Sequence, residues 1–299
     1  MSVLKNKLKW LQDRQKMAKV FLDKNKKIIL YIKLVGSVFF LAYILSRLNF
    51  VALEEIFKHI DYLYLFLALA LTFVVSLIYN LRYYYILLKE KSNPGFLNLY
   101  LINRFSNLIN FILPGGLGQE LGRLAYLKKK KVAVFSSVID RVLGLLSLAL
   151  VGVLGLIFSQ KYLFPAILGF LILVAIIIVF AIQIKKRTHY SIYRPLLLSI
   201  IYSLGLVLIA FFELKAVDSL VLFSELLIFV PLVSIALMLP ISINGYGLRE
   251  YLWVIMLGLP IETAVSYGLV GYIIGFLLSL PGLILVFDKR TIVSNKFHN

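Results

Sequence analysis

The sequence predicts an all-α polytopic membrane protein, with about six full spans and two re-entrant broken-helix hairpins arranged as an inverted-topology repeat. Three observations predict this fold class. Hydrophobic residues make up 61% of the 299-residue chain and charged residues only 15%, whereas soluble domains are about half apolar and a quarter charged. Several uncharged runs approach the roughly 20 residues that a spanning helix needs. Two apolar regions are each interrupted by a polar stretch that contains Pro and Gly.

The charge of the chain excludes several classes of function. Its formal net charge is +18, from 32 Lys and Arg against 14 Asp and Glu. The basic residues bunch beside apolar runs, which is typical of the positive-inside rule and suits anionic lipid headgroups. No nucleic-acid-binding module accompanies them, so we expect no nucleic-acid partner. The chain has no cysteine and three scattered histidines, so we expect no disulfide, metal or cofactor.

The chain begins with a basic segment, 1–27, whose apolar residues fall near one helical face. This pattern fits an amphipathic helix on the cytoplasmic surface, or a solvated tail that only sets topology. A short acidic connector, 50–61, is expected outside, and Arg82 is expected where the second span returns to the cytoplasm. We expect a multi-pass protein of the cell membrane with both termini, including the tail 291–299, in the cytoplasm. The six expected spans are 28–45, 62–88, 132–158, 162–184, 195–216 and 261–287.

The first broken element lies at residues 103–123. The pattern over 96–113 is helical, Pro114 begins a glycine-rich break, and 119–127 can form a second short helix. Backbone groups freed by the break need protein or water as partners, because hydrocarbon offers none. The basic segments on both sides indicate that the element starts and ends in the cytoplasm. We therefore expect a re-entrant hairpin that lines a polar cavity, and the alternative is an ordinary aqueous loop between two spans.

A second element of the same kind follows Pro240. Arg249 follows Pro240 at the same separation as Arg123 follows Pro114, and an acidic residue accompanies each arginine. Residues 195–287 repeat the order of elements in 62–158 with inverted membrane topology. Inverted repeats with interrupted helices indicate a transport site near the membrane midplane. Chance similarity is the alternative. The residues expected to act as hinges are Pro114, Gly115, Gly116, Gly118, Pro240, Gly245 and Gly247.

The polar residues of both elements and of span 132–158 suggest the chemistry of an anion site. Helix N-termini after the glycines would present free N–H groups, and arginines offer bidentate donors to phosphate. Asparagines suit sugar or headgroup hydroxyls, and carboxylates would neutralise the arginines or bind a cationic headgroup or a proton. The alternative is that these residues form internal Arg–carboxylate pairs that hold the broken helices together. The candidate substrate-binding residues are Asn103, Arg104, Asn107, Asn110, Glu120, Arg123, Asp140, Arg141, Asn244, Arg249 and Glu250.

Asp140 and Arg141 lie within an otherwise apolar span. Bare charges at membrane depth are costly, so we expect these two to pair with each other, with the hairpin or with a ligand.

An ordered set of motifs carries a family resemblance: Asn103-Arg104, Asn110, Leu113-Pro114-Gly115-Gly116-Leu117-Gly118-Gln119-Glu120, Arg123, Asp140-Arg141 and Asn244-Gly245-Tyr246-Gly247-Leu248-Arg249-Glu250. Together they resemble the lysylphosphatidylglycerol synthase transmembrane family, also called flippase-like domain proteins, over residues 28–290. The family often has Pro-Gly-Gly-x-Gly-Gly-Glu, whereas this chain has Gln119 before Glu120. The resemblance implies a domain that moves lipids between leaflets. We expect no lysylphosphatidylglycerol synthesis, because the sequence leaves no room for the soluble domain that performs it in bifunctional relatives.

We therefore predict a flippase for an anionic, phosphate-bearing lipid, either a phospholipid or a polyprenyl-phosphate-linked sugar. The expected partners are anionic membrane lipids and this lipid-linked substrate. The sequence has no HExxH, GxSxG or Walker A motif, so we predict a transporter rather than an enzyme. Two alternatives stay open, a membrane-embedded lipid-modifying enzyme and an accessory subunit of a glycolipid pathway.

Overall fold

The computed structural model describes residues 35, 38–40, 42–89, 94–112, 117–127, 130–159, 167–169, 171–179, 193–238, 242 and 245–287. Within these residues the chain is all-helical, without a strand. Four helical segments are long and apolar enough to cross a membrane: Tyr62–Leu88, Val132–Phe158, Tyr193–Ala216 and Ile261–Leu283. The predicted class of all-α multi-pass membrane protein is confirmed.

The helices of the described residues are α2 (Phe50–Lys58), α3 (Tyr62–Lys89), α4 (Phe96–Ile112), α5 (Leu117–Tyr126), α6 (Lys130–Phe158), α8 (Tyr193–Ala216), α9 (Phe223–Leu237), α10 (Leu248–Leu257), α11 (Ile261–Ser279), the 3₁₀ turn η2 (Leu280–Leu283) and α12 (Ile284–Phe287). The predicted helices on both sides of the first break are present as α4 and α5. Most of the expected connector 50–61 is helical, because Asn49 caps α2 by accepting a hydrogen bond from the Val51 N–H group at 3.0 Å.

Four predicted regions lie partly or wholly outside the described residues. They are the basic segment 1–27, parts of the expected spans 28–45 and 162–184, and the tail 291–299. The last expected span, 261–287, is not one regular helix. It tightens into η2 at Leu280, where Pro281 lacks the N–H group that an α-helix needs.

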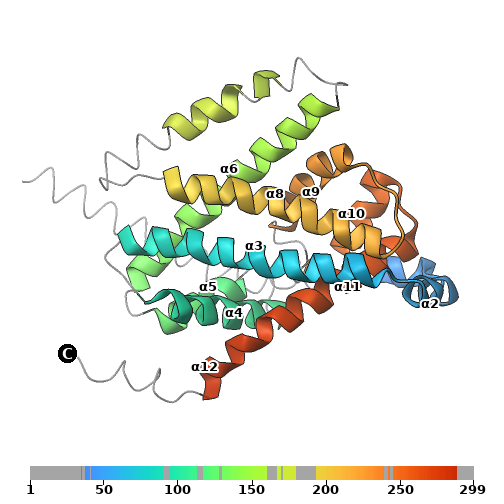
Figure 1. The fold of residues 1–299 in the computed structure, drawn as a ribbon, viewed down its shortest axis with the longest axis horizontal. Coiled ribbons are helices and arrows are strands. Elements are labelled where there is room, and N and C mark those ends of the chain that lie inside the picture. Colours follow the sequence, from blue (N-terminus) through green and yellow to red (C-terminus); the bar gives the residue numbers. More distant parts are fainter. Residues whose placement is uncertain are drawn as a thin grey trace, which may run out of the picture.

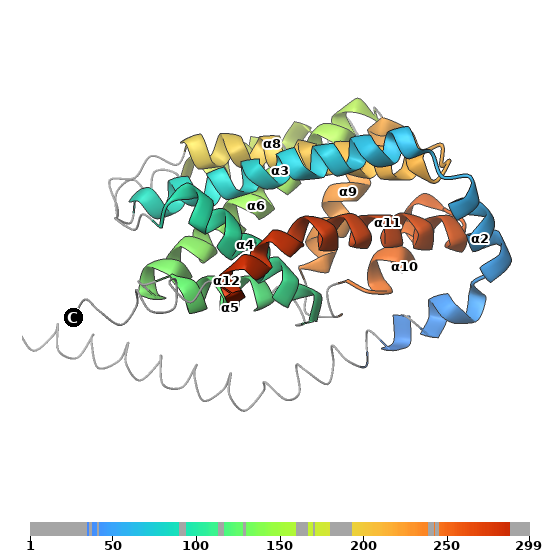
Figure 2. The same cartoon turned by 60° about the horizontal axis from the view of Figure 1, so that its bottom comes forward.

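The two long helices α3 and α8 lie side by side and antiparallel (Figures 1 and 2). The start of α3 meets the end of α8, where the Asp61 N–H group donates to the Ala216 carbonyl at 2.9 Å. Gly205 of α8 lets the helices approach closely, since a Cβ at that position would lie 3.3 Å from Val75 Cγ1. Small residues at such contacts are typical of helix packing in membranes.

Two further contacts bring backbones together at glycines. Helix α6 packs along α9, and a Cβ at Gly155 would lie 2.8 Å from the backbone carbon of Leu227. Helix α4 packs on η2, and a Cβ at Gly282 would lie 2.6 Å from the backbone carbon of Arg104. In Figure 2, α4 and α5 lie beneath one end of the α3–α8 pair, and α10 and α11 lie beneath the other end.

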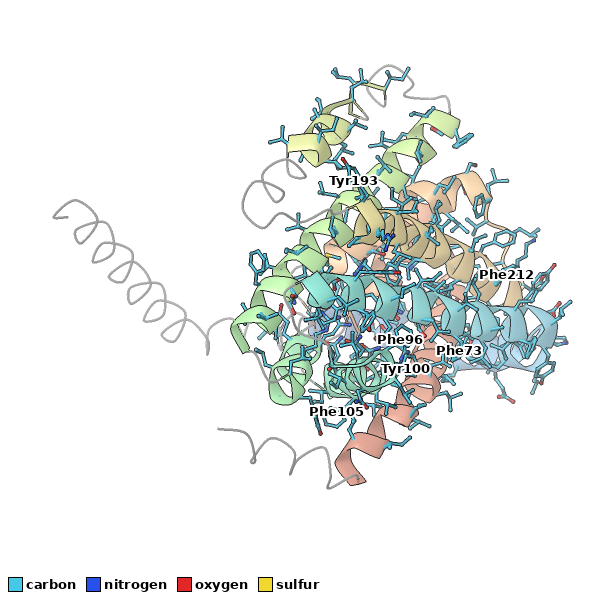
Figure 3. All side chains as sticks on the ribbon, turned by 60° about the vertical axis from the view of Figure 1, so that its left-hand side comes forward. Phe73, Phe96, Tyr100, Phe105, Tyr193 and Phe212 are labelled. Carbon is cyan, nitrogen blue, oxygen red and sulfur yellow. The ribbon has the colours of Figure 1, made fainter. Side chains whose placement is uncertain are left out.

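The bundle exposes apolar side chains and buries polar ones. Phe66, Val138, Leu197 and Ile273 are among the exposed large hydrophobic residues, whereas several asparagines, arginines and carboxylates are buried. Figure 3 shows apolar side chains that project outward around the bundle, with Phe73 labelled among them. This arrangement suits a protein whose outer surface meets lipid and whose ionisable groups face its interior.

Candidate functional site

Three arginines and one aspartate are buried together where α3, α4, α5 and α6 meet beside α8. Arg82, Arg104, Arg123 and Asp140 are each at most 4% exposed. They share polar and aromatic neighbours from α3, α4 and α8. The "Asp140 cluster" hereafter comprises Tyr79, Asn80, Arg82, Tyr83, Asn103, Arg104, Arg123, Asp140, Ser199 and Tyr202.

The Asp140 carboxylate joins α6 to α3 and α5. Its Oδ1 atom accepts a hydrogen bond from Arg82 Nε at 2.7 Å, and its Oδ2 atom accepts one from Arg123 Nη1 at 3.4 Å. The Tyr79 hydroxyl donates to Oδ2 at 3.4 Å and itself accepts from Arg123 Nη2. One buried carboxylate therefore holds two guanidinium groups that come from different helices.

Every nitrogen of the Arg123 guanidinium has a partner. In addition to the bonds above, Nε donates to Asn103 Oδ1 at 3.0 Å, and Asn103 Nδ2 donates to Asn80 Oδ1 at 2.7 Å. The guanidinium lies over the Tyr83 ring, 3.6 Å from its centre. Arg123 thus forms the internal pair that the sequence offered as an alternative to ligand binding, and it fixes the short helix α5 to α3, α4 and α6.

Arg82, which the sequence places where the second span returns to the cytoplasm, is buried between the helices. It binds Asp140, and its Nη1 atom donates to Ser199 Oγ of α8 at 3.3 Å. Its guanidinium also lies over the rings of Tyr79 and Tyr202, at 4.9 and 5.2 Å. An arginine near a span end is typical of the membrane–water interface. Only its ion pair with Asp140 of α6 distinguishes Arg82 from such an interfacial arginine.

Arg104 is the arginine with spare hydrogen-bonding capacity. It lies over the ring of Tyr100, 4.9 Å away, on the helix marked by Tyr100 and Phe105 in Figure 3. It interacts electrostatically with Tyr79 and Tyr202, which also face Arg82. Its Nε atom is buried and has no hydrogen-bond partner within the described part of the chain. The Asp140 cluster therefore holds three guanidinium groups against one carboxylate, an excess of two positive charges.

Arg141 pairs with the hairpin, which is one of the three expected outcomes, whereas Asp140 pairs both with the hairpin through Arg123 and with α3 through Arg82. Arg141 Nε pairs with Glu120 Oε1 of α5 at 3.0 Å, and both side chains are partly exposed. Gln119 Nε2 donates to Asn107 Oδ1 at 3.2 Å, so the residue that departs from the family pattern links α5 to α4. Asn110 is half-buried on α4.

A second charged group, the "Arg249 cluster", comprises Glu213 of α8, Arg249 and Glu250 of α10, and Tyr267 and Tyr272 of α11. Both carboxylates are 6% exposed. The Arg249 guanidinium lies over the Tyr272 ring at 4.8 Å and interacts electrostatically with both glutamates and with Tyr267. Two carboxylates against one guanidinium leave one negative charge in excess. Sequence reasoning missed Glu213, although a lone carboxylate in an apolar span is itself a functional signal.

Two of the glycines that were expected to act as hinges in the second element have a left-handed backbone conformation. Gly245 and Gly247 have φ values of 82° and 74°, a region that favours glycine, and Gly247 immediately precedes α10. Gly118 lies in the first turn of α5. The remaining candidates, Pro114, Gly115, Gly116, Pro240 and Asn244, lie outside the described residues.

The two clusters lie at different depths of the bundle. Helix α8 contributes Ser199 and Tyr202 to the first cluster and Glu213 to the second. A rise of about 1.5 Å per residue places Ser199 and Glu213 roughly 21 Å apart along this helix. The positive and the negative centre are therefore well separated, and one continuous helix joins them.

A family model described as Lysylphosphatidylglycerol synthase TM region matches residues 30–282, which contain both clusters. No curated protein and no solved structure matches the chain.

Proposed function

The chain belongs to the family of the lysylphosphatidylglycerol synthase TM region, and from this membership and the Asp140 cluster we propose that it is a lipid flippase. It moves an anionic, phosphate-bearing lipid between the leaflets of the cell membrane. The headgroup passes through the polar interior, while the acyl or prenyl chains stay in the bilayer. Phospholipids and polyprenyl-phosphate-linked sugars share the phosphate on which the proposal rests.

The observation that carries the proposal is the excess positive charge of the Asp140 cluster. Buried charges without partners are costly, and ionisable groups at membrane depth usually mark a substrate path. A phosphate group would compensate the excess, and a guanidinium binds phosphate with two parallel hydrogen bonds. We assign this contact to Arg104, whose Nε atom is buried without a partner among the described residues. Arg82 and Arg123 hold the surrounding helices and add to the positive potential.

Helix packing supports an inverted repeat of 62–158 and 195–287. In such a repeat α4 corresponds to α9, and α6 corresponds to α11 with its continuation η2. The contact of α6 with α9 then has its counterpart in the contact of α4 with α11 and η2. Both contacts are close approaches at a glycine, Gly155 in one and Gly282 in the other. The short helices α5 and α10 then form the inner arms of two re-entrant hairpins around a midplane site. We place both termini in the cytoplasm, on the side of the basic flanks.

The test is lipid translocation in vesicles that contain the purified protein. A fluorescent phosphatidylglycerol and a fluorescent phosphatidylcholine are incorporated, and a membrane-impermeant quencher reports each lipid's exchange between leaflets. We expect faster exchange of the anionic lipid. In Arg104→Gln this exchange should slow about 10- to 100-fold, because one hydrogen bond to a charged group contributes about 1.5–3 kcal/mol.

Arg194→Gln is the matched control. Arg194 also lies over a tyrosine, Tyr85, at 5.7 Å, but it is exposed. Equal exchange in wild type, Arg104→Gln and Arg194→Gln would refute the assigned phosphate contact. Mass spectrometry of lipids recovered from the vesicles tests the enzyme alternative. A lipid of changed mass would show that the protein modifies lipids, and the flippase proposal would be replaced by that of a lipid-modifying enzyme. An inert protein that regains activity only with a copurified enzyme would instead be an accessory subunit.

A further inference from the structure

The Arg249 cluster holds one carboxylate more than its guanidinium can compensate. Glu213 and Glu250 come from different helices, are both buried, and both interact electrostatically with Arg249. An isolated carboxylate inside a protein is so costly that it usually takes up a proton instead of remaining charged. With one proton bound, the cluster is neutral. Without it, the cluster has one negative charge at membrane depth.

The surroundings of the two carboxylates are polar on one side and apolar on the other. Glu213 also interacts with Tyr267, and Glu250 with Tyr272 and with backbone N–H groups at the start of α10. On the side of α3, the Tyr64 ring stacks on Phe212, next to Glu213. The titratable groups on the elements that form the cluster or pack against it are Arg249 of α10, Tyr246 before it, Tyr267 and Tyr272 of α11, Lys215 of α8, which lies over Phe211, and Tyr64 of α3.

Unpartnered polar atoms gather beside the same cluster. Glu250 Oε2 and Trp253 Nε1 are buried, and neither has a hydrogen-bond partner within the described residues. The Glu250 carboxylate packs against Gly268 of α11, where an added Cβ would lie 3.1 Å from its Cδ atom. Buried polar atoms are normally paired with protein or with ordered water. This region between α10 and α11 is therefore suited to hold water or a proton.

We propose that the Arg249 cluster is the coupling site of the transporter and binds one proton. The proton from the aqueous phase adds to a carboxylate oxygen of Glu213 or Glu250, and Arg249 neutralises the other carboxylate, with no other bond changed. A deprotonated cluster repels an anionic headgroup, whereas a protonated one does not. Proton binding thus favours passage of the phosphate beyond the Asp140 cluster. Coupling rests on the proposed function, but proton binding does not.

The sequence supplies a probe for proton binding. The chain has two tryptophans, Trp10 and Trp253. The Trp253 ring packs on Tyr267 at 4.8 Å and lies one helical turn from Glu250. In a Trp10→Phe variant, tryptophan fluorescence therefore reports the Arg249 cluster alone. The purified variant is titrated between about pH 4 and pH 9, a range that covers buried carboxyl groups, and we expect a step that corresponds to one proton.

The expected step is lost in Glu250→Gln and in Glu213→Gln, because either change removes the excess negative charge. Glu225→Gln is the control, since Glu225 is an exposed glutamate on α9 and its removal leaves the step. Gel filtration of each variant checks the fold, and two independent glutamine variants guard against misfolding of one. A step that persists in both glutamine variants overturns the proposal. A signal that follows sodium concentration at constant pH also overturns it, because the ligand is then a metal cation.

The coupling is tested in vesicles with the same variants. With one proton coupled, phosphatidylglycerol exchange by the Trp10→Phe protein should fall by up to about tenfold per pH unit above the step. In Glu250→Gln and Glu213→Gln we expect less than about a twofold change over the same range. An unaltered pH dependence in both variants overturns the coupling. Absence of exchange in every variant refutes the flippase proposal instead, and the fluorescence titration still decides proton binding.

Discussion

Replacing Asp140 by asparagine should destabilise the protein strongly. Asparagine is nearly isosteric and keeps an oxygen for the Tyr79 hydroxyl, but it removes the negative charge shared by Arg82 and Arg123. The excess of the Asp140 cluster then rises from two positive charges to three. Removing one partner of a buried ion pair costs about 3–5 kcal/mol. Since a folded domain is typically stable by about 5–15 kcal/mol, this is a large fraction of the total.

The matched control is Glu54→Gln, which removes a carboxylate from an exposed pair. Glu54 binds Lys58 at 2.7 Å, and the side chains are 66% and 64% exposed. Exposed pairs contribute about 0–1 kcal/mol. Unfolding in a mild detergent with added denaturant, followed by circular dichroism, measures both variants. We expect Asp140→Asn to lower the free energy of unfolding by about 3–5 kcal/mol and Glu54→Gln by less than about 1 kcal/mol.

A second substitution separates charge from packing. Adding Arg82→Gln to Asp140→Asn removes one of the uncompensated guanidinium groups, so the double variant should regain part of the lost stability. If Asp140→Asn is no less stable than Glu54→Gln, the Asp140 cluster does not hold the helices together. If the double variant loses the sum of the two single effects, the Arg82–Asp140 interaction contributes nothing measurable.

Two further predictions concern helix contacts. Gly155→Ala should destabilise the protein by about 1–3 kcal/mol, because the added Cβ would lie 2.8 Å from the Leu227 backbone. The control is Gly152→Ala on the same helix, where the added Cβ would lie 3.5 Å from Pro231. This variant should be neutral or slightly stabilising, since alanine favours a helix over glycine. Equal melting temperatures for the two variants would contradict this reasoning. Asn103→Ala leaves Arg123 Nε and Asn80 Oδ1 without their partner and should cost about 1–3 kcal/mol. The control Asn110→Ala, at a half-buried position, should lower the free energy of unfolding by less in the same assay.

The opposite charges of the two clusters give the bundle an electrical polarity along α8. An anion is attracted to the Asp140 cluster and repelled by the Arg249 cluster when the latter is deprotonated. Under the proposed function, the first cluster binds the headgroup and the second controls its passage. The separation of roughly 21 Å along the helix means that a headgroup cannot contact both clusters at once.

The sequence alone determined the helical elements. Apolar runs predicted the spans 62–88 and 132–158 at the bounds that the structure shows, because the length of a spanning helix depends on bilayer thickness and local hydrophobicity. Proline and glycine predicted the separation of α4 from α5 and the start of a helix after Gly247. These are local properties, which a short stretch of chain carries without reference to the rest. Family membership was predicted from ordered motifs and is confirmed.

Only the tertiary structure decided which charges meet. Asp140 was expected to pair, but its two partners, Arg82 and Arg123, come from helices far apart in the sequence. The sequence predicted no partner for Arg82 and missed Glu213, because each lies in a run that reads simply as a span. Ion-pair formation depends on which helix faces come together, and packing between distant segments sets this. The same packing left Arg123 fully paired and Arg104 Nε without a partner among the described residues, which is why we propose Arg104 for the phosphate contact.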